Sequence, residues 1–159
     1  MIRFMKPSDV PQVRYIAEQA WRHTYSSFIP LSIQDQVLAD AYSDEEMTYR
    51  FDNCVNFVFE EGQEVIGYAF FKGEGSTVHL ESIYIHPSHQ RKGIGQKLMD
   101  AAIMHFQPVH TVSLVVYKGN DRIAFYEKLG FQIEKEVQGN FFEHPITFIV
   151  MNKQYIEKA

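Results

Sequence analysis

The spacing of the hydrophobic residues changes along this chain, and that change limits the folds it can adopt. After a short apolar segment at Ile2–Met5, apolar residues in the first sixty positions recur every three to four residues, which is typical of amphipathic helices. From Phe57 the period becomes two, which is typical of half-buried strands. Helical and strand-like segments then alternate to the end of the chain. This order predicts an α/β protein with a central, largely antiparallel sheet.

Capping and turn residues mark the ends of the expected elements. The expected strands are Ile2–Met5, Phe57–Glu60, Val65–Phe71, Thr77–Ile85, Thr111–Tyr117, Phe131–Val137 and Phe142–Met151. The expected helices begin at Ser8 and Asp9, span Ile33–Ala41, begin at the capping box of Ser43 and Glu46, span Gly93–Phe106 and span Asp121–Leu129. Glu61-Gly62-Gln63 predicts a short hairpin connection. Since no repeat or linker interrupts the chain, we expect one domain over residues 1–159.

Composition narrows the functional classes. The chain has 159 residues, of which 45% are hydrophobic and 22% charged, so it is long and apolar enough to form a core without metals or disulfides. Its net charge of -5 argues against a dedicated nucleic-acid-binding protein. Cys54 is the only cysteine, which excludes an intramolecular disulfide and favours a reducing compartment. With no apolar run long enough for a signal peptide or a membrane span, a cytoplasmic protein without membrane contact is expected.

The stretch Gln90-Arg91-Lys92-Gly93-Ile94-Gly95 lies between an expected strand and an expected helix. Its glycines allow a ligand to approach the N–H groups of a helix start, where the helix dipole favours an anion such as a diphosphate. Arg91 and Lys92 add two positive charges at the same place. A Walker loop is absent, and the dinucleotide fingerprint fails because position 98 is Leu. The alternative is that the two glycines only let the helix pack closely on the strand.

A second motif follows about thirty residues later, Asn120-x-x-x-Ala124-Phe125-Tyr126-Glu127-Lys128-Leu129-Gly130-Phe131. Together the two motifs resemble the GNAT superfamily of acetyl-CoA-dependent N-acetyltransferases, and the resemblance extends over essentially the whole chain. It implies a mixed, mostly antiparallel sheet of about six to seven strands with helices on both faces. It also implies one N-acetyltransferase domain that uses acetyl-CoA as co-substrate and no metal.

The resemblance implies a role for particular residues in binding acetyl-CoA. The residues implied to bind it are Ile83, Tyr84 and Ile85 through the pantetheine arm, Gln90, Arg91, Lys92, Gly93, Ile94, Gly95 and Gln96 around the diphosphate, Asn120 at the pantetheine arm, and Lys128 at the adenosine 3′-phosphate. The strand that carries residues 83–85 is expected to separate from its neighbour there, so that the pantetheine arm pairs with it as an extra strand would.

Two residues are assigned to proton transfer. Tyr126 is expected to be the general acid. A thiol has a pKa of about 8.5 and a tyrosine of about 10, so the phenol is protonated at neutral pH and can donate a proton to the leaving sulfur. An alkyl amine is mostly protonated at neutral pH, and Glu81 is the candidate base that removes its proton. Strand alternation puts Glu81 on one face with Ile83 and Ile85, so it is either this base or a solvent-exposed residue at the strand's start.

The acceptor is expected to be a primary amine that attacks acetyl-CoA directly in a ternary complex. The segments Trp21–Pro30 and Ala41–Met47 resemble the bacterial branch that includes polyamine acetyltransferases of the PaiA type. Residues 1–60 carry five basic and nine acidic side chains, a net charge of -4 that would attract a cationic small amine. Simply solvated acidic helix faces would look the same.

Other interpretations stay open at this point. The chain could acetylate protein N-termini or lysines, or it could be a non-catalytic sensor that binds acyl-CoA. His86 and His89 have a ligand-like spacing, but Pro87 puts them in a loop without a complete ligand set, so no metal is expected. Dimers are common in the family, which by analogy leaves a homodimer open.

Overall fold

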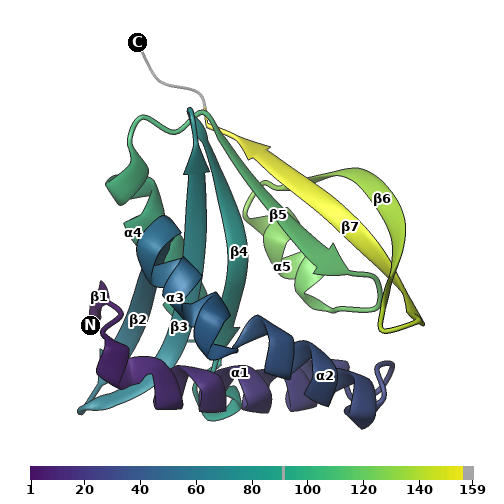
Figure 1. Ribbon diagram of the computed structural model, residues 1–159. Helices are drawn as coiled ribbons and strands as arrows, with labels where there is room; N and C mark the ends of the chain where they lie inside the picture. Colours follow the sequence, from purple (N-terminus) through teal and green to yellow (C-terminus); the bar gives the residue numbers. More distant parts are fainter. Residues whose placement is uncertain (91, 156–159) are drawn as a thin grey trace.

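The computed structural model describes residues 1–90 and 92–155, which form a seven-stranded sheet flanked by helices (Figure 1). The strands are β1 (Ile2–Phe4), β2 (Val55–Glu61), β3 (Glu64–Glu74), β4 (Thr77–Ile85), β5 (Thr111–Tyr117), β6 (Gln132–Phe141) and β7 (His144–Gln154). The helices are α1 (Val10–Tyr25), α2 (Leu31–Ala41), α3 (Asp44–Asn53), α4 (Ile94–Phe106) and α5 (Arg122–Lys128), with 3-10 turns η1 (Pro7–Asp9) and η2 (Pro87–His89).

The sheet has the order β1-β2-β3-β4-β5-β7-β6, and all neighbours are antiparallel except β4 and β5. The predicted mixed, mostly antiparallel sheet with helices on both faces is therefore confirmed. Among the described residues, no helix has the length and apolar character needed to cross a membrane.

Local signals placed most element ends correctly. Ser43 caps α3, because its Oγ accepts a hydrogen bond of 3.1 Å from the backbone N–H of Glu46. The last hairpin was predicted less well. Its turn consists of Phe142 and Glu143, both with positive φ, whereas the sequence predicted that Phe142 would begin the closing strand. Neither residue favours the left-handed region, so the usual turn signal is missing there.

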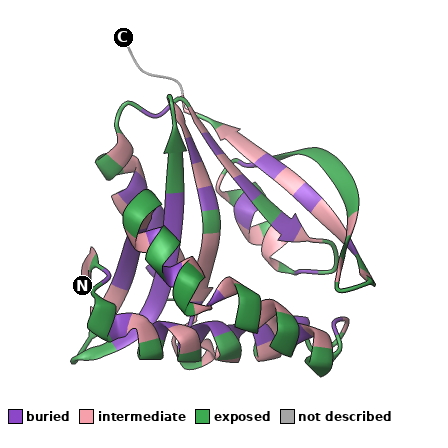
Figure 2. Cartoon of the chain, viewed as in Figure 1, coloured by how far each residue is buried: buried purple, intermediate pink, exposed green. Residues whose placement is uncertain are grey.

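Two layers of helices cover the sheet. Helices α1, α2 and α3 lie on one face, and α4 and α5 lie on the other (Figure 1). The residues of β3 divide accordingly: Tyr68 and Phe70 pack with α1 and α3, and Ala69 and Phe71 pack with α4. Both faces of the central strands are thus buried, as Figure 2 shows, whereas most of β6 is exposed.

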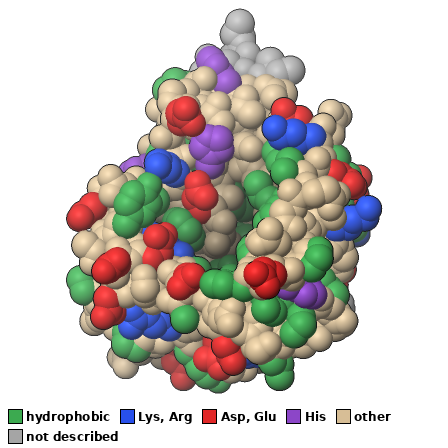
Figure 3. Space-filling model, turned by 45° about the vertical axis from the view of Figure 1, so that its right-hand side comes forward, with side chains coloured by type: hydrophobic (Ala, Val, Ile, Leu, Met, Phe, Trp, Pro, Cys, Tyr) green, Lys and Arg blue, Asp and Glu red, His purple; other side chains and the backbone are tan. Residues whose placement is uncertain are grey.

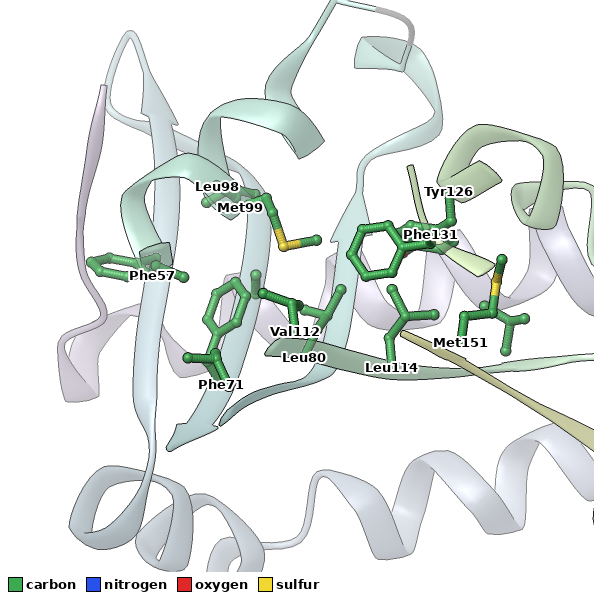
Figure 4. Packing of buried hydrophobic residues seen from close by; sticks show 14 of the residues in the cluster. Phe57, Phe71, Leu80, Leu98, Met99, Val112, Leu114, Tyr126, Phe131 and Met151 are labelled. Carbon is green, nitrogen blue, oxygen red and sulfur yellow. The ribbon is translucent and has the colours of Figure 1, made fainter. Parts of the chain in front are cut away.

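The larger core lies between the sheet and helices α4 and α5 (Figure 4). Leu98 and Met99 of α4 pack over Phe71 and Val112 of the sheet, and Tyr126 of α5 packs beside Phe131. This core holds α4 and α5 in place at the two sides of β4. The beginning of each helix is thereby positioned at the open part of the sheet described below.

Leu98 is fully buried in this core, and its truncation tests how much the core contributes. Leu98→Ala should lower the free energy of unfolding by about 3 kcal/mol, through lost apolar burial and a residual cavity. Met104 is on the same helix but 71% exposed, so Met104→Ala is the matched control and should change it little. Urea denaturation measures both variants, and equal losses would contradict this description of the core.

Candidate functional site

The central feature of the site is a gap in the sheet between β4 and β5. The two strands pair only over Thr77–Leu80 and Thr111–Leu114, and beyond these residues they separate (Figure 1). The edge of β4 from residue 81 to 85 that faces β5 has no partner strand among the described residues, while its other edge stays paired with β3. Backbone N–H and C=O groups need hydrogen-bond partners when buried. This edge can therefore receive an extended ligand chain.

A β-bulge at Glu81 marks the point of separation. Phe70 pairs with Ser82 and Phe71 pairs with Leu80, so Glu81 has no opposite residue in β3. The predicted alternation, which put Glu81 on the face of Ile83 and Ile85, is wrong because the bulge shifts the phase of the strand. Ile83 and Ile85 pack in the core beside α4, as does Leu80. Glu81 is exposed and acts electrostatically on Cys54 and Lys72, toward the α3 side.

Two cavities meet at this gap. The narrower one, about 80 Å³, lies between β4 and β5. Among the residues that line it are the predicted Glu81, Ile83, Tyr84, Ile85, Gln90, Asn120 and Tyr126. The larger one, about 620 Å³, lies between the beginnings of α4 and α5. Among the residues that line it are the predicted Ile85, Gln90, Gly93, Ile94, Gly95, Gln96 and Lys128.

The start of α4 has the geometry of an anion site. Gly93 caps the helix with a φ of 74°, which residues with a side chain rarely adopt, and no acidic residue occupies the first turn. A Cβ at Gly95 would lie 3.6 Å from Ile83 and 3.8 Å from Arg122 and Phe125, at the cavity wall. Lys92 is exposed and lies outside the described lining of both cavities. Arg91 lies outside the described residues.

Tyr126 comes from α5 and is buried where the narrower cavity meets the core. Burial raises the pKa of its phenol above the ordinary value, and the nearby Arg122 guanidinium opposes that rise. The phenol therefore stays protonated through the neutral range, which is what a proton donor requires.

Asn120 fixes the start of α5. Its Oδ1 accepts a 2.8 Å hydrogen bond from the backbone N–H of Arg122, and its Nδ2 donates a 3.1 Å hydrogen bond to the Tyr25 hydroxyl. Its buried side chain thus joins α5 to the end of α1. On the opposite wall Trp21 Nε1 donates a 2.9 Å hydrogen bond to the Tyr84 hydroxyl. These bonds hold α1 across the gap.

Sequence reasoning missed two contributions to the cavities. Arg122 lines both, and Thr24 near the end of α1 does so too. Arg122 carries a signal in the sequence, because a cation in the first turn of a helix is unfavourable to the helix dipole and so points to another purpose. The segment that holds Thr24 was expected to face only the acceptor.

Metal and cysteine chemistry find no support in the described part of the chain. No group of three or more His, Cys, Asp or Glu side chains there could hold a metal ion. The imidazoles of His86 and His89 instead share the Ser88 hydroxyl, at 2.7 and 2.9 Å. Burial raises the pKa of the Cys54 thiol, which disfavours the reactive thiolate.

Comparison with known proteins agrees with this geometry. The model of the acetyltransferase (GNAT) family matches residues 14–131. The chain belongs to the GNAT family of acetyltransferases. It is accordingly an acetyl-CoA-dependent N-acetyltransferase. The predicted family and reaction class are confirmed.

Relatives within this family differ in what they acetylate. Glucosamine 6-phosphate N-acetyltransferase of Schizosaccharomyces pombe is 31% identical over 77 residues, 44% of this chain and 69% of that protein. The ribosomal protein bS18-alanine N-acetyltransferase of Haemophilus influenzae is 28% identical over 59% of this chain and 65% of its own. The PaiA N-acetyltransferase of Thermoplasma acidophilum, solved with coenzyme A, has the same fold, with a TM-score of 0.83 at 21% identity over 98% of both chains.

Gly95→Val tests the larger cavity as the site for coenzyme A. The added methyl groups would fill the space in front of the α4 N-terminus, so affinity should fall by roughly tenfold or more while the fold is retained. Gly95→Ala adds one carbon at ordinary contact distances and should have a smaller effect. Calorimetric titration with coenzyme A measures affinity, and thermal unfolding checks the fold. Unchanged affinity of the valine variant would refute this assignment.

Proposed function

We propose that this protein moves the acetyl group of acetyl-CoA to a primary amine of a small cationic molecule of the polyamine class. The observation that carries the proposal is the gap between β4 and β5, which lies between the start of α4 and the buried Tyr126. The donor and the acceptor would meet in this gap, within one acetyltransferase domain.

The proposed acetyl-CoA site consists mainly of backbone groups rather than charged side chains. The unpaired edge of β4 at Ile83–Ile85 would bind the pantetheine arm, with Asn120 at its side. The diphosphate would lie at the start of α4, against residues 93–96, and Lys128 at the cavity wall would meet the 3′-phosphate. Gln90 donates a 3.3 Å hydrogen bond to the Ile85 carbonyl, so it can align the loop with the strand. A ligand would replace the missing strand partner and neutralise the helix start.

Acetyl-CoA supplies a thioester whose carbonyl carbon accepts the amine and whose sulfur leaves. Tyr126 would donate its phenolic proton to that sulfur, because burial keeps the phenol neutral. Glu81, exposed at the bulge on the other side of the gap, would take the proton of the amine directly or through water. The two groups would then act from different sides of one opening.

The preference for a cationic acceptor rests on charge. Figure 3 shows a hollow lined by hydrophobic side chains, with acidic side chains gathered around it. The first turn of α3 alone carries Asp44, Glu45 and Glu46, and α2 adds Asp35 and Asp40. Three of these five form ion pairs, Asp44 with Arg14, Asp35 with Arg22 and Glu46 with Arg50. Asp40 and Glu45 have no ion pair among the described residues, so the balance of these eight side chains is -2. Such a rim attracts a polycation and raises its rate of encounter.

The second candidate is an acceptor at a peptide N-terminus. The similarity to the bS18-alanine N-acetyltransferase favours it. A peptide has one N-terminal amine and would bind mainly through apolar contacts. A polyamine carries further positive charges, which would bind to the acidic rim. Ionic strength therefore distinguishes the two candidates.

Replacing the phenol tests the acid role. Tyr126→Phe should lower kcat by about a hundredfold, which is typical for loss of a general acid, because the sulfur then leaves without its proton. Affinity for coenzyme A should stay within a factor of two or so, since the ring and its packing remain. Steady-state kinetics and calorimetry measure the two quantities. A variant that turns over at the parent rate would contradict the assignment.

An acceptor panel tests the substrate class. Release of thiol from acetyl-CoA is measured with spermidine, spermine, aminoglycosides, amino acids and an alanine-initiated peptide. The polyamines should give the highest kcat/KM, and that value should fall several-fold as added salt shortens the Debye length from about 10 to 3 Å. The peptide rate should change little with salt. If spermidine and spermine give no signal above background, the polyamine proposal is wrong.

A further inference from the structure

Arg122 is a half-buried cation without an anionic partner among the described residues. It begins α5, and among the described residues no carboxylate forms an ion pair with it. Its guanidinium lies over the Phe125 ring, 4.9 Å from the centroid. Partial burial removes part of its water, and the positive end of the helix dipole adds repulsion. Desolvation and repulsion by the helix dipole both make this position unfavourable for a cation. We therefore expect Arg122 to interact with a negative charge that forms only during the reaction.

The position of Arg122 shows where that charge would arise. It lines both the narrow gap and the larger cavity, so it lies where the two meet. One of its terminal nitrogens, Nη2, is 3.8 Å from the place where a Cβ of Gly95 would be. Tyr126 follows four residues later on the same side of α5, as residues four apart do in a helix. The Asn120 side chain holds the Arg122 backbone in this place.

We propose that Arg122 is a positioning residue that stabilises the phenolate formed on Tyr126 when the leaving sulfur takes its proton. This inference rests on the proposed role of Tyr126. As the bond between nitrogen and carbon forms and the bond between carbon and sulfur breaks, the electron pair goes to sulfur. The Tyr126 proton follows it, and the amine proton goes to Glu81. Glu81 then releases its proton to water and Tyr126 takes one up from water, which restores both groups.

The balance of acidities favours such a residue. A tyrosine of ordinary pKa is already a weaker acid than the thiol it must serve, and burial makes Tyr126 weaker still. The titratable groups that act on Tyr126 among the described residues are Arg122 on its own helix, Tyr84 on β4 and Tyr25 on α1. Of these only Arg122 is a cation, and it lowers the pKa of Tyr126.

Arg122→Gln tests the proposal in two ways. The first readout is the pKa of Tyr126, followed by NMR of protein labelled at tyrosine Cζ, without ligand, over the pH range in which circular dichroism shows an intact fold. Removing a cation disfavours the phenolate, so this pKa should rise by about one unit. The second is kinetic: kcat should fall by about tenfold, with little change in the affinity for coenzyme A. Arg122→Lys keeps the charge and should recover much of both effects.

Controls separate this proposal from its alternatives. Lys118 is an exposed cation just beyond β5, outside the described lining of both cavities, so Lys118→Gln should change neither readout. If Arg122→Gln weakens binding of coenzyme A but leaves kcat and the Tyr126 pKa unchanged, Arg122 is a phosphate ligand and the proposal is wrong. If Tyr126→Phe is fully active, the proposed acid fails instead. If Tyr126→Phe is slow but Arg122→Gln leaves the Tyr126 pKa unchanged, the acid role of Tyr126 stands and only the proposed role of Arg122 is wrong.

Discussion

A strand that loses its neighbour halfway along the sheet determines the rest of this structure. β4 pairs with β5 for four residues and then leaves one edge free, where residues 81–85 line the narrower cavity. The bulge at Glu81 makes the separation possible, because it adds a residue on β4 and turns the strand away from β5. Helices α4 and α5 then start at this opening. In the proposed function, the pantetheine arm of acetyl-CoA would complete this free edge of β4.

The same opening explains how an acidic protein can serve a polyanionic co-substrate. The net charge of -5 would repel phosphates if charge acted evenly over the molecule. At the start of α4, however, the residues from Gly93 to Gln96 line the larger cavity, and the first turn carries no acid. The acidic residues of α2 and α3 lie on the other face of the sheet. In the proposed reaction the sheet therefore separates a phosphate-binding side from an amine-binding side.

Much of this arrangement could be predicted from the sequence where local chemistry decides it. The ends of β4 and β5 and the cap at Ser43 follow from period, turn and capping residues. What failed depends on contacts distant in sequence. The bulge at Glu81 arises from pairing with β3 and leaves no local signal, and the turn at Phe142 and Glu143 uses residues that rarely adopt positive φ. Arg122 lies at a position that the second motif leaves unspecified, so the motif does not predict it.

The bulge also bears on how protons would move in the proposed reaction. In an uninterrupted strand Glu81 would share the face of Ile83 and Ile85, against the core that holds Tyr126. A carboxylate there would lie beside the phenol, where its negative charge would make a phenolate harder to form. The extra residue instead directs Glu81 toward the α3 side, while Tyr126 stays with α5 and beside Arg122. In the proposed reaction, base and acid would thus work from opposite sides of the opening, and neither would weaken the other.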